Sequence, residues 1–464
     1  MSYQLRNYQE EDVRFGLGVG SVINANPPGL GKTLETLATL ERLPQGSILV
    51  ISPKMATGVW KYEAHKWLNW DSVRITGEFN KDERKAIREE FDRGNTRILI
   101  INSAMIEEIQ AWRSVWKYIV VDEAHLLGLL NPKSKTFELM CKFHYERIFV
   151  LTGTPVRKGP QDLWTLLHLV NQRKFPSYWS FVYKYCHVNK TRFGTEILSR
   201  PKHPSAFNEM IYKYMIRRKK HDVLKDLPDK VRQTYMISAL EGQQAEIYRQ
   251  MQEDMIAEIP NSDDLLVAQT KMTQVLRLQQ LLVCPRILGV PEDGVALDIL
   301  VEYLIPQEFD QKRAVVIATP FRQAIPFVSA AIKQKIDDVH VEVIHGKIEE
   351  TAQEVAQRFQ EHKSHRKVLI YTIKSGASWT AHTASTGFML GYDWSAINNL
   401  QAEDRIHRLG QLDNVIWRYL LHEGTVDETV MARLDERAMG MGWTLETKDF
   451  LLKKQQMKEE YFKH

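Results

Sequence analysis

Residues 24–33 have the residue types and the spacing of a phosphate-binding loop. Two glycines precede a Lys-Thr pair, a short apolar run lies upstream and a helical pattern follows. A strand, a glycine-rich loop and a helix in this order direct backbone N–H groups at phosphate. We expect Lys32 to reach the β- and γ-phosphates of a nucleotide and the Thr33 hydroxyl to hold Mg²⁺. An ordinary glycine-rich turn is the alternative. The residues expected to line the loop are Pro28, Gly29, Leu30, Gly31, Lys32 and Thr33.

The loop departs from the strict pattern G-x-x-x-x-G-K-[ST] at its first glycine, where this chain has Asn26. Asn tolerates a positive φ better than other non-glycine residues, so we expect the loop to close. Upstream, the amide of Gln9 carries a donor and an acceptor and could read the edge of adenine. A surface glutamine on a short helix explains that residue, taken alone, at least as well.

Asp122, Glu123 and His125 form a second group of residues with chemical potential, directly after an apolar run. A carboxylate at a strand end, paired with a phosphate loop, completes the shell of Mg²⁺, and we assign this task to Asp122. Glu123 is the predicted general base for the attacking water, and His125 would couple the site to the neighbouring domain. Two acids at a strand end could instead cap the next helix.

Arg405 and Arg408 form the third group. On a helix, residues three apart share one face, and two guanidinium groups presented together suit a phosphate chain. An arginine finger of this kind raises the rate of phosphoryl transfer by roughly 10³–10⁵-fold. The alternative is a surface helix with ion pairs, in which Asp404 and Arg408 lie four residues apart.

These groups have to be positioned by β-sheets. Continuous apolar runs alternate with helical stretches, which indicates parallel sheets covered on both faces, and ligands bind at the carboxyl ends of such strands. The strands of a first sheet are expected at 48–51, 98–101, 118–121 and 148–151, and those of a second at 314–318, 341–344, 368–371, 387–390 and 415–420. The fold class is therefore α/β. The expected parts are a first lobe at 1–160, a mostly helical insertion at 161–240, a helical linker at 241–296, a second lobe at 297–435 and a helical tail at 436–464.

The composition is that of ordinary globular domains, with 44% hydrophobic and 26% charged residues. The 62 basic and 58 acidic residues nearly balance, so any basic groove must be local. The three cysteines are widely separated and fit a reducing cytosol. No apolar run approaches the length of a bilayer span and the N-terminus is not a signal peptide. We expect no membrane association and a cytoplasmic location.

Taken in order, the motifs resemble those of the Swi/Snf family of superfamily 2 helicase-like ATPases. Residues 5–9 resemble its adenine-reading motif, which adds Arg6 to Gln9 as a nucleotide contact. Residues 29–33 are similar to its first motif and residues 122–125 to its DEAH box. The most specific match is at 401–411, where the spacing agrees at Gln401, Asp404, Arg405, His407, Arg408, Gly410 and Gln411. The resemblance also implies nucleotide contacts from Gly376 and Gln401.

The resemblance implies two RecA-like parallel-sheet lobes with mostly helical insertions between them, and ATP with Mg²⁺ at the cleft between the lobes. The expected function is DNA-stimulated ATP hydrolysis that drives translocation on double-stranded DNA. Loops at strand ends would hold DNA phosphates regardless of sequence. The expected DNA contacts are Ser52, Pro53, Lys54, Ser103, Thr152, Arg217, Arg218, Thr372 and Lys374. We expect a monomeric bare motor of bacterial or viral origin, in the host cytoplasm if viral, with a protein partner left open.

The chain departs from the family pattern in two places. Acidic residues usually precede Gly29, where this chain has Asn26 and Pro27, and the motif at 372–382 normally carries more glycines. This version looks closer to the distant branch that includes annealing helicases. A strand-separating or annealing helicase, an RNA translocase, and an ATP-gated clamp or assembly factor therefore remain alternatives.

Overall fold

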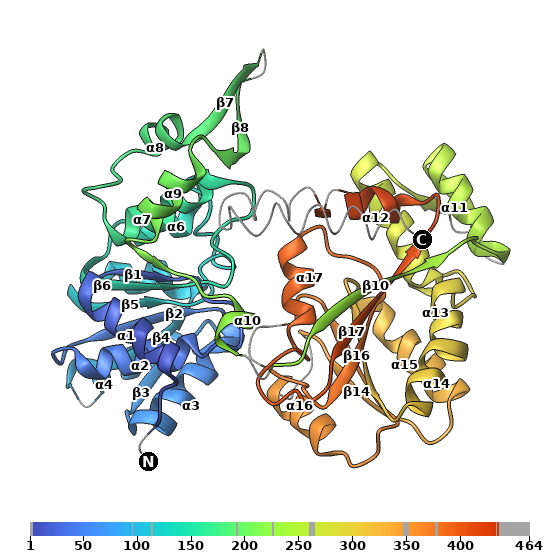
Figure 1. Cartoon of the computed structure of the whole chain (residues 1–464), viewed down its shortest axis with the longest axis horizontal. Helices are drawn as coiled ribbons and strands as arrows, with labels where there is room; N and C mark the ends of the chain where they lie inside the picture. The colour runs from blue at the N-terminus through green and yellow to red at the C-terminus, as the bar shows by residue number, and fades with distance from the viewer. Residues whose placement is uncertain are drawn as a thin grey trace. The chain divides into compact units, whose positions relative to one another are not determined.

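The computed structural model describes residues 3–94, 96–112, 115–191, 194–224, 227–258, 265–346, 352–375, 379–432 and 434–435. The chain divides into two compact units at Lys225/Asp226 (Figure 1). The predicted tail at 436–464 lies outside the described residues. In the part of the chain that is described, no helix is long and apolar enough to cross a bilayer.

A parallel sheet of seven strands forms the centre of the first unit, in the order β3-β4-β2-β5-β6-β1-β9. Its strands are β1 (Val22–Asn24), β2 (Ile48–Ser52), β3 (Ser72–Ile75), β4 (Ile98–Asn102), β5 (Val115–Val121), β6 (His144–Leu151) and β9 (Met215–Ile216). The helices are α1 (Asn7–Val19), α2 (Lys32–Arg42), α3 (Thr57–Leu68), α4 (Lys81–Asp92), α5 (Ile106–Ala111), α6 (Lys135–Met140), α7 (Leu163–Val170), α8 (Tyr178–Tyr185), α9 (Pro204–Ile211) and α10 (Lys220–Val223), with short 3₁₀ turns at Lys54–Ala56, Ser103–Met105 and Pro160–Asp162.

Alternate residues of each strand enter different cores, which is why the strands read as continuous apolar runs. Leu49 and Ile51 of β2 pack with α5, α6 and α7, whereas Ile48 and Val50 pack with α2 and α3 on the opposite face. Helices therefore cover both faces of the sheet (Figure 1).

The second unit repeats this design with a six-stranded parallel sheet, in the order β10-β17-β16-β13-β15-β14. Its strands are β10 (Lys230–Ile237), β13 (Ala314–Thr319), β14 (His340–Ile344), β15 (Lys367–Thr372), β16 (Ala384–Met389) and β17 (Val415–His422), and a small hairpin is formed by β11 (Ile256–Glu258) and β12 (Leu265–Val267). The helices are α11 (Gly242–Asp254), α12 (Lys271–Val283), α13 (Val295–Ile299), the π-helix η5 (Leu300–Leu304), α14 (Ile305–Asp310), α15 (Ile325–Lys335), α16 (Ala352–Glu361) and α17 (Ala396–Glu403), with 3₁₀ turns at Pro285–Leu288 and Arg322–Ala324.

The prediction of two parallel-sheet lobes is confirmed, but the boundaries between the parts differ from those expected. The insertion predicted at 161–240 is not simply helical. It holds an antiparallel hairpin, β7 (Cys186–Thr191) with β8 (Gly194–Pro201), whose β-branched residues favour extended backbone. It also holds β10, which pairs with β17 along its whole length. The second unit therefore includes β10 and the predicted linker at 241–296.

Candidate nucleotide site

The phosphate loop joins β1 to α2 at the carboxyl end of the first sheet. Gly29 and Gly31 have φ values of +90° and +89°, which only glycine adopts without strain. A Cβ at Gly31 would lie 2.4 Å from Nε2 of Gln9, so the position also demands glycine for space. Because Gly31 is the N-cap of α2, no side chain caps the first N–H groups of this helix, and they suit phosphate oxygens.

The adenine-reading stretch contacts this loop directly. Gln9 Nε2 and the Tyr8 hydroxyl both donate to the carbonyl oxygen of Leu30, at 3.1 and 2.9 Å. The backbone N–H of Arg6 donates to Oε1 of Gln9 at 3.0 Å, while the Arg6 side chain is exposed. Gln9 is therefore a buried part of the loop rather than a surface glutamine.

Asn26 does not adopt the positive φ that was expected of it. Instead its side chain is the centre of a buried polar network. Its Nδ2 donates to Asp12 at 2.7 Å and to Glu35 at 3.4 Å, its Oδ1 accepts from the backbone N–H of Arg218 at 2.8 Å, and its carbonyl oxygen accepts from Lys32 Nζ at 2.9 Å. Asn replaces glycine here for its hydrogen bonds and not for its backbone freedom.

The two carboxylates of this network carry unusual charge states. Burial raises the pKa of Glu35 to about 7, although Asn24 donates to its Oε2 at 2.7 Å. Its other oxygen, Oε1, has no hydrogen-bond partner among the described residues. Burial also raises the pKa of Asp12, against the opposing effect of the Arg218 guanidinium, which donates to its Oδ1 at 2.6 and 2.8 Å.

The prediction that Arg217 and Arg218 contact DNA stays a prediction. In this structure both side chains contact the phosphate loop or its network, and Arg218 does so through ion pairs. The Arg218 guanidinium pairs with Asp12 and with Glu11, at 2.9 Å from the latter, because the loop network needs a cation. Arg217 donates to the carbonyl oxygen of Ala25 at 3.2 Å. Both arginines therefore hold the loop from β9.

Asp122 and Glu123 follow β5 at the same edge of the sheet. Trp60 Nε1 donates to Oδ2 of Asp122 at 2.9 Å and the backbone N–H of Glu123 donates to its Oδ1 at 2.9 Å. Burial, followed by the charge of Glu123, raises the pKa of Asp122 to about 6, whereas Lys32 lowers it. Glu123 has a φ of +46°, a strained conformation that costs a non-glycine residue about 1–3 kcal/mol and is concentrated at functional sites.

His125 links this acidic pair to β6. Its Nδ1 lies 3.3 Å from Oε2 of Glu123 and 2.9 Å from Oγ1 of Thr152. Burial lowers the pKa of His125 to about 4, so the imidazole is neutral at physiological pH. The prediction that Thr152 contacts DNA stays a prediction for its backbone only, because its side chain is fully buried and its hydroxyl also accepts the backbone N–H of Thr154 at 3.1 Å.

These residues fit a magnesium nucleotide. Two buried carboxylates repel one another where a cation would relieve the repulsion, and Lys32 and the N-terminus of α2 supply the positive groups that phosphates need. Mg²⁺ takes oxygen ligands and keeps several waters and phosphate oxygens in its shell. Asp122 and Thr33 would therefore suffice as its protein ligands.

The remaining predicted DNA contacts of the first unit follow strand ends. Pro53 and Lys54 come directly after β2, and Lys54 pairs with Glu78 at 2.8 Å on the surface. Ser103 follows β4 and is exposed. Ser52 is fully buried, so the prediction that it contacts DNA through its side chain is wrong.

In the second unit, Thr372 ends β15 and is buried, and Lys374 is exposed and pairs with Asp393 at 2.7 Å. Gly376 lies outside the described residues. Gln401 is on α17 and partly exposed.

Arg405 and Arg408 do not lie on a helix, contrary to the prediction, because α17 ends at Glu403. The guanidinium of Arg405 lies 5.3 Å from the ring centroid of Trp379 and that of Arg408 donates to Thr380 Oγ1 at 3.1 Å. Arg408 also donates to the carbonyl oxygen of Asp404 at 3.0 Å. The structure thus brings both arginines together beside residues 379–380.

Two acids at the end of α17, Glu403 and its C-cap Asp404, are held by cations of β10. Arg232 makes two bonds of 2.7 Å to the Glu403 carboxylate, and Lys230 lies 2.9 Å from Glu403 and 3.0 Å from Asp404. Burial alone would raise the pKa of Glu403, but the two cations outweigh it and hold that pKa at about 2.

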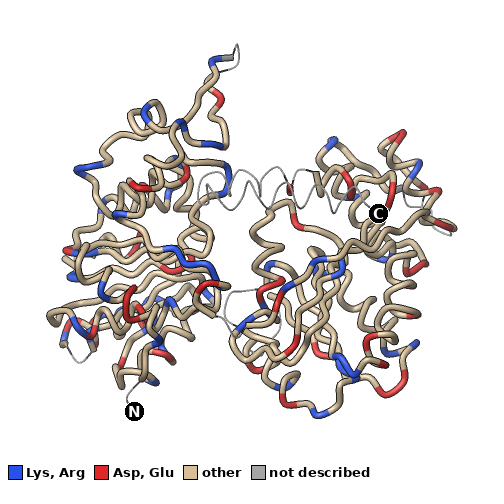
Figure 2. The backbone as a smooth tube through the Cα atoms, in the orientation of Figure 1, with Lys and Arg blue, Asp and Glu red and all other residues tan. Residues whose placement is uncertain are grey.

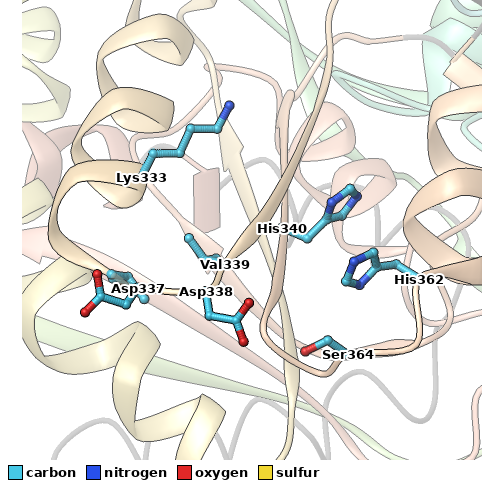
Figure 3. Close-up of a pocket in the computed structure, with 8 residues that line it drawn as sticks. Lys333, Asp337, Asp338, Val339, His340, His362 and Ser364 are labelled. Atoms are coloured by element: carbon cyan, nitrogen blue, oxygen red, sulfur yellow. The ribbon is translucent and has the colours of Figure 1, made fainter.

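A cavity of about 390 Å³ lies where β14 begins, at the edge of the second sheet opposite to β10 (Figure 3). His340 and His362 stack in it, with ring centroids 4.0 Å apart and 8° between the planes. The lone pairs of an imidazole lie in its ring plane, so two rings stacked face to face do not aim their nitrogens at a point between them. Within the described ranges, no group of three or more His, Cys, Asp or Glu is placed to hold a metal, and we assign this cavity no part in the nucleotide site.

The sequence model of the SNF2-related domain matches residues 8–286, more than half of the 464 residues, and this range includes Gln9, the phosphate loop and the Asp122–Glu123 pair. The chain belongs to the SNF2-related family. In the second unit of this SNF2-related chain, the helicase conserved C-terminal domain matches residues 296–410, which include Arg405 and Arg408.

Curated relatives of this SNF2-related chain are much longer. The CHD3-type chromatin-remodeling factor CHR7 of Arabidopsis thaliana is 28% identical over 89% of this chain and 34% of the relative. The DNA annealing helicase and endonuclease ZRANB3 of Homo sapiens is 23% identical over 95% of this chain and 40% of the relative. The uncharacterized ATP-dependent helicase MG018 of Mycoplasma genitalium is 27% identical over 92% of this chain and 41% of the relative. Across such relatives the chain spans between 26% and 61% of their length.

Among solved structures, the chain is similar to the Sulfolobus solfataricus SWI2/SNF2 ATPase core in complex with double-stranded DNA. The identity is 22% and the TM-score 0.45, with 96% of this chain and 94% of that chain covered.

Three residues of the loop network, Asp12, Asn24 and Glu35, are not predicted as site residues from the motifs. A signal for two of them exists in the sequence. Asp12 lies three residues after Gln9 and Glu35 three residues after Lys32, so each shares a helix face with a predicted site residue. Asn24 precedes Asn26 by two residues and accepts its backbone N–H at 3.1 Å, a short-range turn bond.

Proposed function

We propose that this chain is a DNA-stimulated ATP hydrolase that translocates along double-stranded DNA. The observation that carries the proposal is the edge of the first sheet where the phosphate loop and the Asp122–Glu123 pair meet. Lys32 acts electrostatically on Asp122 there, as a nucleotide site requires. The names of the relatives, which include chromatin-remodeling factors and an annealing helicase, support DNA as the partner.

Each residue at this edge has a defined task in the proposal. Lys32 exchanges the Asn26 carbonyl for phosphate oxygens, and the first N–H groups of α2 hold the same phosphates. Glu123 accepts the proton of the attacking water, and the neutral His125 with Thr152 fixes the direction of its carboxylate. Mg²⁺, held by Asp122 and Thr33, would neutralise charge on the phosphates.

The second unit supplies Arg405 and Arg408 to the transferred phosphate in this proposal. Both guanidinium groups are already oriented by residues 379–380 and by the turn after α17, so little freedom would be lost when they bind phosphate. Closure of the units on ATP and reopening after hydrolysis would then advance the protein along one strand.

DNA would be held by exposed residues at strand ends, chiefly Lys54, Ser103 and Lys374. Such contacts reach phosphates and not base edges, so binding would be independent of sequence and would weaken with salt. A strand-annealing helicase is the second candidate, and the likeness to ZRANB3 over 95% of this chain favours it.

The decisive experiment measures the ATP hydrolysis rate with duplex DNA, single-stranded DNA and RNA in parallel, together with displacement of a third strand from a triplex. We expect the greatest stimulation by duplex DNA and displacement without unwinding of a fork. Lys32→Ala and Glu123→Gln should abolish the stimulated rate. Normal rates in both variants would show that the assigned site is wrong, and unwinding of the fork would favour the helicase.

The arginines need a separate test. Arg405→Ala or Arg408→Ala should lower hydrolysis far more than ATP binding, because the proposed contact forms only as phosphate is transferred. Equal losses in binding and hydrolysis would rule out the finger role.

A further inference from the structure

Residues 173–202 concentrate positive charge in a chain that is otherwise balanced. They include seven Lys and Arg residues and one carboxylate, Glu196. The segment forms α8 and the β7–β8 hairpin, which projects beyond the helices on the sheet (Figure 1). Basic residues lie along the hairpin and around α8 (Figure 2). None of the nucleotide-site residues belongs to this segment, so its charge needs another explanation.

Two aromatic side chains of α8 are exposed within this positive region. Trp179 and Tyr183, one helical turn apart, are each 48% exposed, and their rings stack at 5.8 Å with 29° between the planes. Tyr178 packs edge-on against Trp179 at 5.4 Å and is itself packed against buried Trp164. The pair is thus fixed from within the unit while part of its surface remains open to solvent.

Lysine side chains lie near the C-terminal end of α8, on the helix that carries the aromatic pair and on the hairpin that follows it. Lys202 Nζ donates to the carbonyl oxygen of Tyr183 at 2.6 Å, which places a cation from the end of β8 at the end of α8. Lys184 follows Tyr183 directly, is exposed, and has its ammonium 5.1 Å from the ring centroid of Tyr185. Lys190 extends the same charge along β7.

A flat aromatic surface beside ammonium groups suits an unpaired base and its phosphates. Bases stack on exposed aromatic rings and phosphates bind nearby cations, largely without sequence preference. The bases inside a duplex are stacked on one another and offer no free face to a protein surface. A protein partner would need a wider apolar patch than two rings surrounded by charge.

We propose that α8 and the β7–β8 hairpin form a binding surface for single-stranded DNA, distinct from the strand-end loops proposed to hold duplex DNA. This surface rests on the proposed function, and it gives the translocase a grip on an unpaired strand next to a duplex, as at a branch or an open end. The proposed surface predicts that the protein prefers DNA with both a duplex and a single-stranded part over duplex DNA alone.

The test measures, by fluorescence anisotropy and without ATP, the affinity of the full chain for a labelled oligothymidine. The affinities of variants are compared with that of the unaltered protein. Trp179→Ala combined with Tyr183→Ala should weaken binding about tenfold or more, because the bases then have no ring to stack on. Trp179→Phe combined with Tyr183→Phe keeps both rings and should keep most of the affinity. Lys184→Glu with Lys190→Glu should weaken binding. It should also make the slope of log affinity against log salt concentration shallower by about 0.7 for each phosphate that is no longer neutralised.

The matched control is Tyr303→Ala, which removes a tyrosine that is 59% exposed on η5 of the other unit. It should leave oligothymidine binding unchanged. Unchanged affinity in the alanine pair, with native circular dichroism, would overturn the proposal, and so would equal losses in the alanine and phenylalanine pairs. The proposed function fails separately, if duplex DNA does not stimulate ATP hydrolysis by the unaltered protein.

Discussion

At the scale of single residues, the centre of the nucleotide site is an amide. Asn26 donates to two buried carboxylates and accepts from a backbone N–H, and its carbonyl holds Lys32. An aspartate of the same shape could not donate to either acid. The residue therefore allows Asp12 and Glu35 to lie close together beneath the phosphate loop.

Asn26→Asp should lower the free energy of unfolding of the first unit by about 3–5 kcal/mol, because it buries a third acid without a matching cation. Adding Asp12→Asn should recover much of this loss, since the amide donor and the carboxylate then exchange places. Chemical denaturation of the single and double variants measures both effects. No recovery in the double variant would contradict this account of Asn26.

Glu35 makes stability depend on pH. Its pKa is raised from 4.5 to about 7 in the folded protein, so its contribution is fully present below pH 4.5 and is lost as pH rises through 7. Above pH 7 the free energy of unfolding is lower by about 3 kcal/mol than it is below pH 4.5, as far as Glu35 determines it. Glu35→Gln should therefore gain stability relative to the unaltered protein at pH 8 but not at pH 4.5. If Glu35→Gln changed the free energy of unfolding equally at both pH values, Glu35 would not be the source of the pH dependence.

Trp60 orients the predicted metal ligand, because its indole N–H donates to Asp122. Trp60→Phe removes that hydrogen bond, and the removal of a group that orients a metal ligand typically weakens metal binding 10–100-fold. We expect the Mg²⁺ concentration that half-saturates ATP hydrolysis to rise by roughly tenfold. Trp116→Phe is the matched control, since Trp116 is equally buried and its indole N–H has no hydrogen-bond partner in the described structure. A similar rise in both variants would point to packing alone.

At the scale of elements, β10 fixes the end of α17. Its two cations hold Glu403, which is fully buried and also accepts from the Tyr419 hydroxyl. Because the arginines follow within five residues, this junction also determines where Arg405 and Arg408 lie.

Glu403→Gln should cost about 3 kcal/mol of unfolding free energy at pH 7, from the lowering of the Glu403 pKa from 4.5 to about 2. A lowered pKa contributes stability above the unfolded value, so the effect is complete at neutral pH and fades only as pH falls below 4.5. Glu302→Gln, in an exposed ion pair with Lys335, should cost less than about 1 kcal/mol. Similar costs in the two variants would show that burial of Glu403 is unimportant.

The sequence predicts elements well where a single periodicity decides them. The runs at 48–51 and 98–101 lie within β2 and β4, because strands covered on both faces must be apolar throughout. β10 escapes prediction because its residues are mostly polar or exposed, so no apolar run marks it. The turn after α17 cannot be foreseen either, since it depends on Lys230 and Arg232, more than 170 residues away in the chain. The bond from Trp60 to Asp122 also joins residues far apart in the chain, 62 positions from one another.

At the scale of the whole molecule, the chain has two units with separate cores. Proteins of this kind often depart from two-state unfolding. We expect calorimetry to resolve two transitions, with Asn26→Asp lowering one and Glu403→Gln lowering the other. A single transition that both variants lower equally would show that the units unfold as one.

The segment that joins the units is anchored at both ends to the chemistry. Arg218 is fixed to the loop network, and Lys230 and Arg232 are fixed to the acids before the arginines. In the proposed function, the loop that would bind phosphate and the arginines that would act on it are therefore joined by the segment that begins at Arg218 and ends at Lys230. We expect glycines inserted at 219–229 to weaken any coupling between these two ends, because glycine is the most flexible residue in a linker. If the proposed translocation is correct, such a protein would still hydrolyse ATP but would displace fewer third strands from a triplex for each ATP consumed.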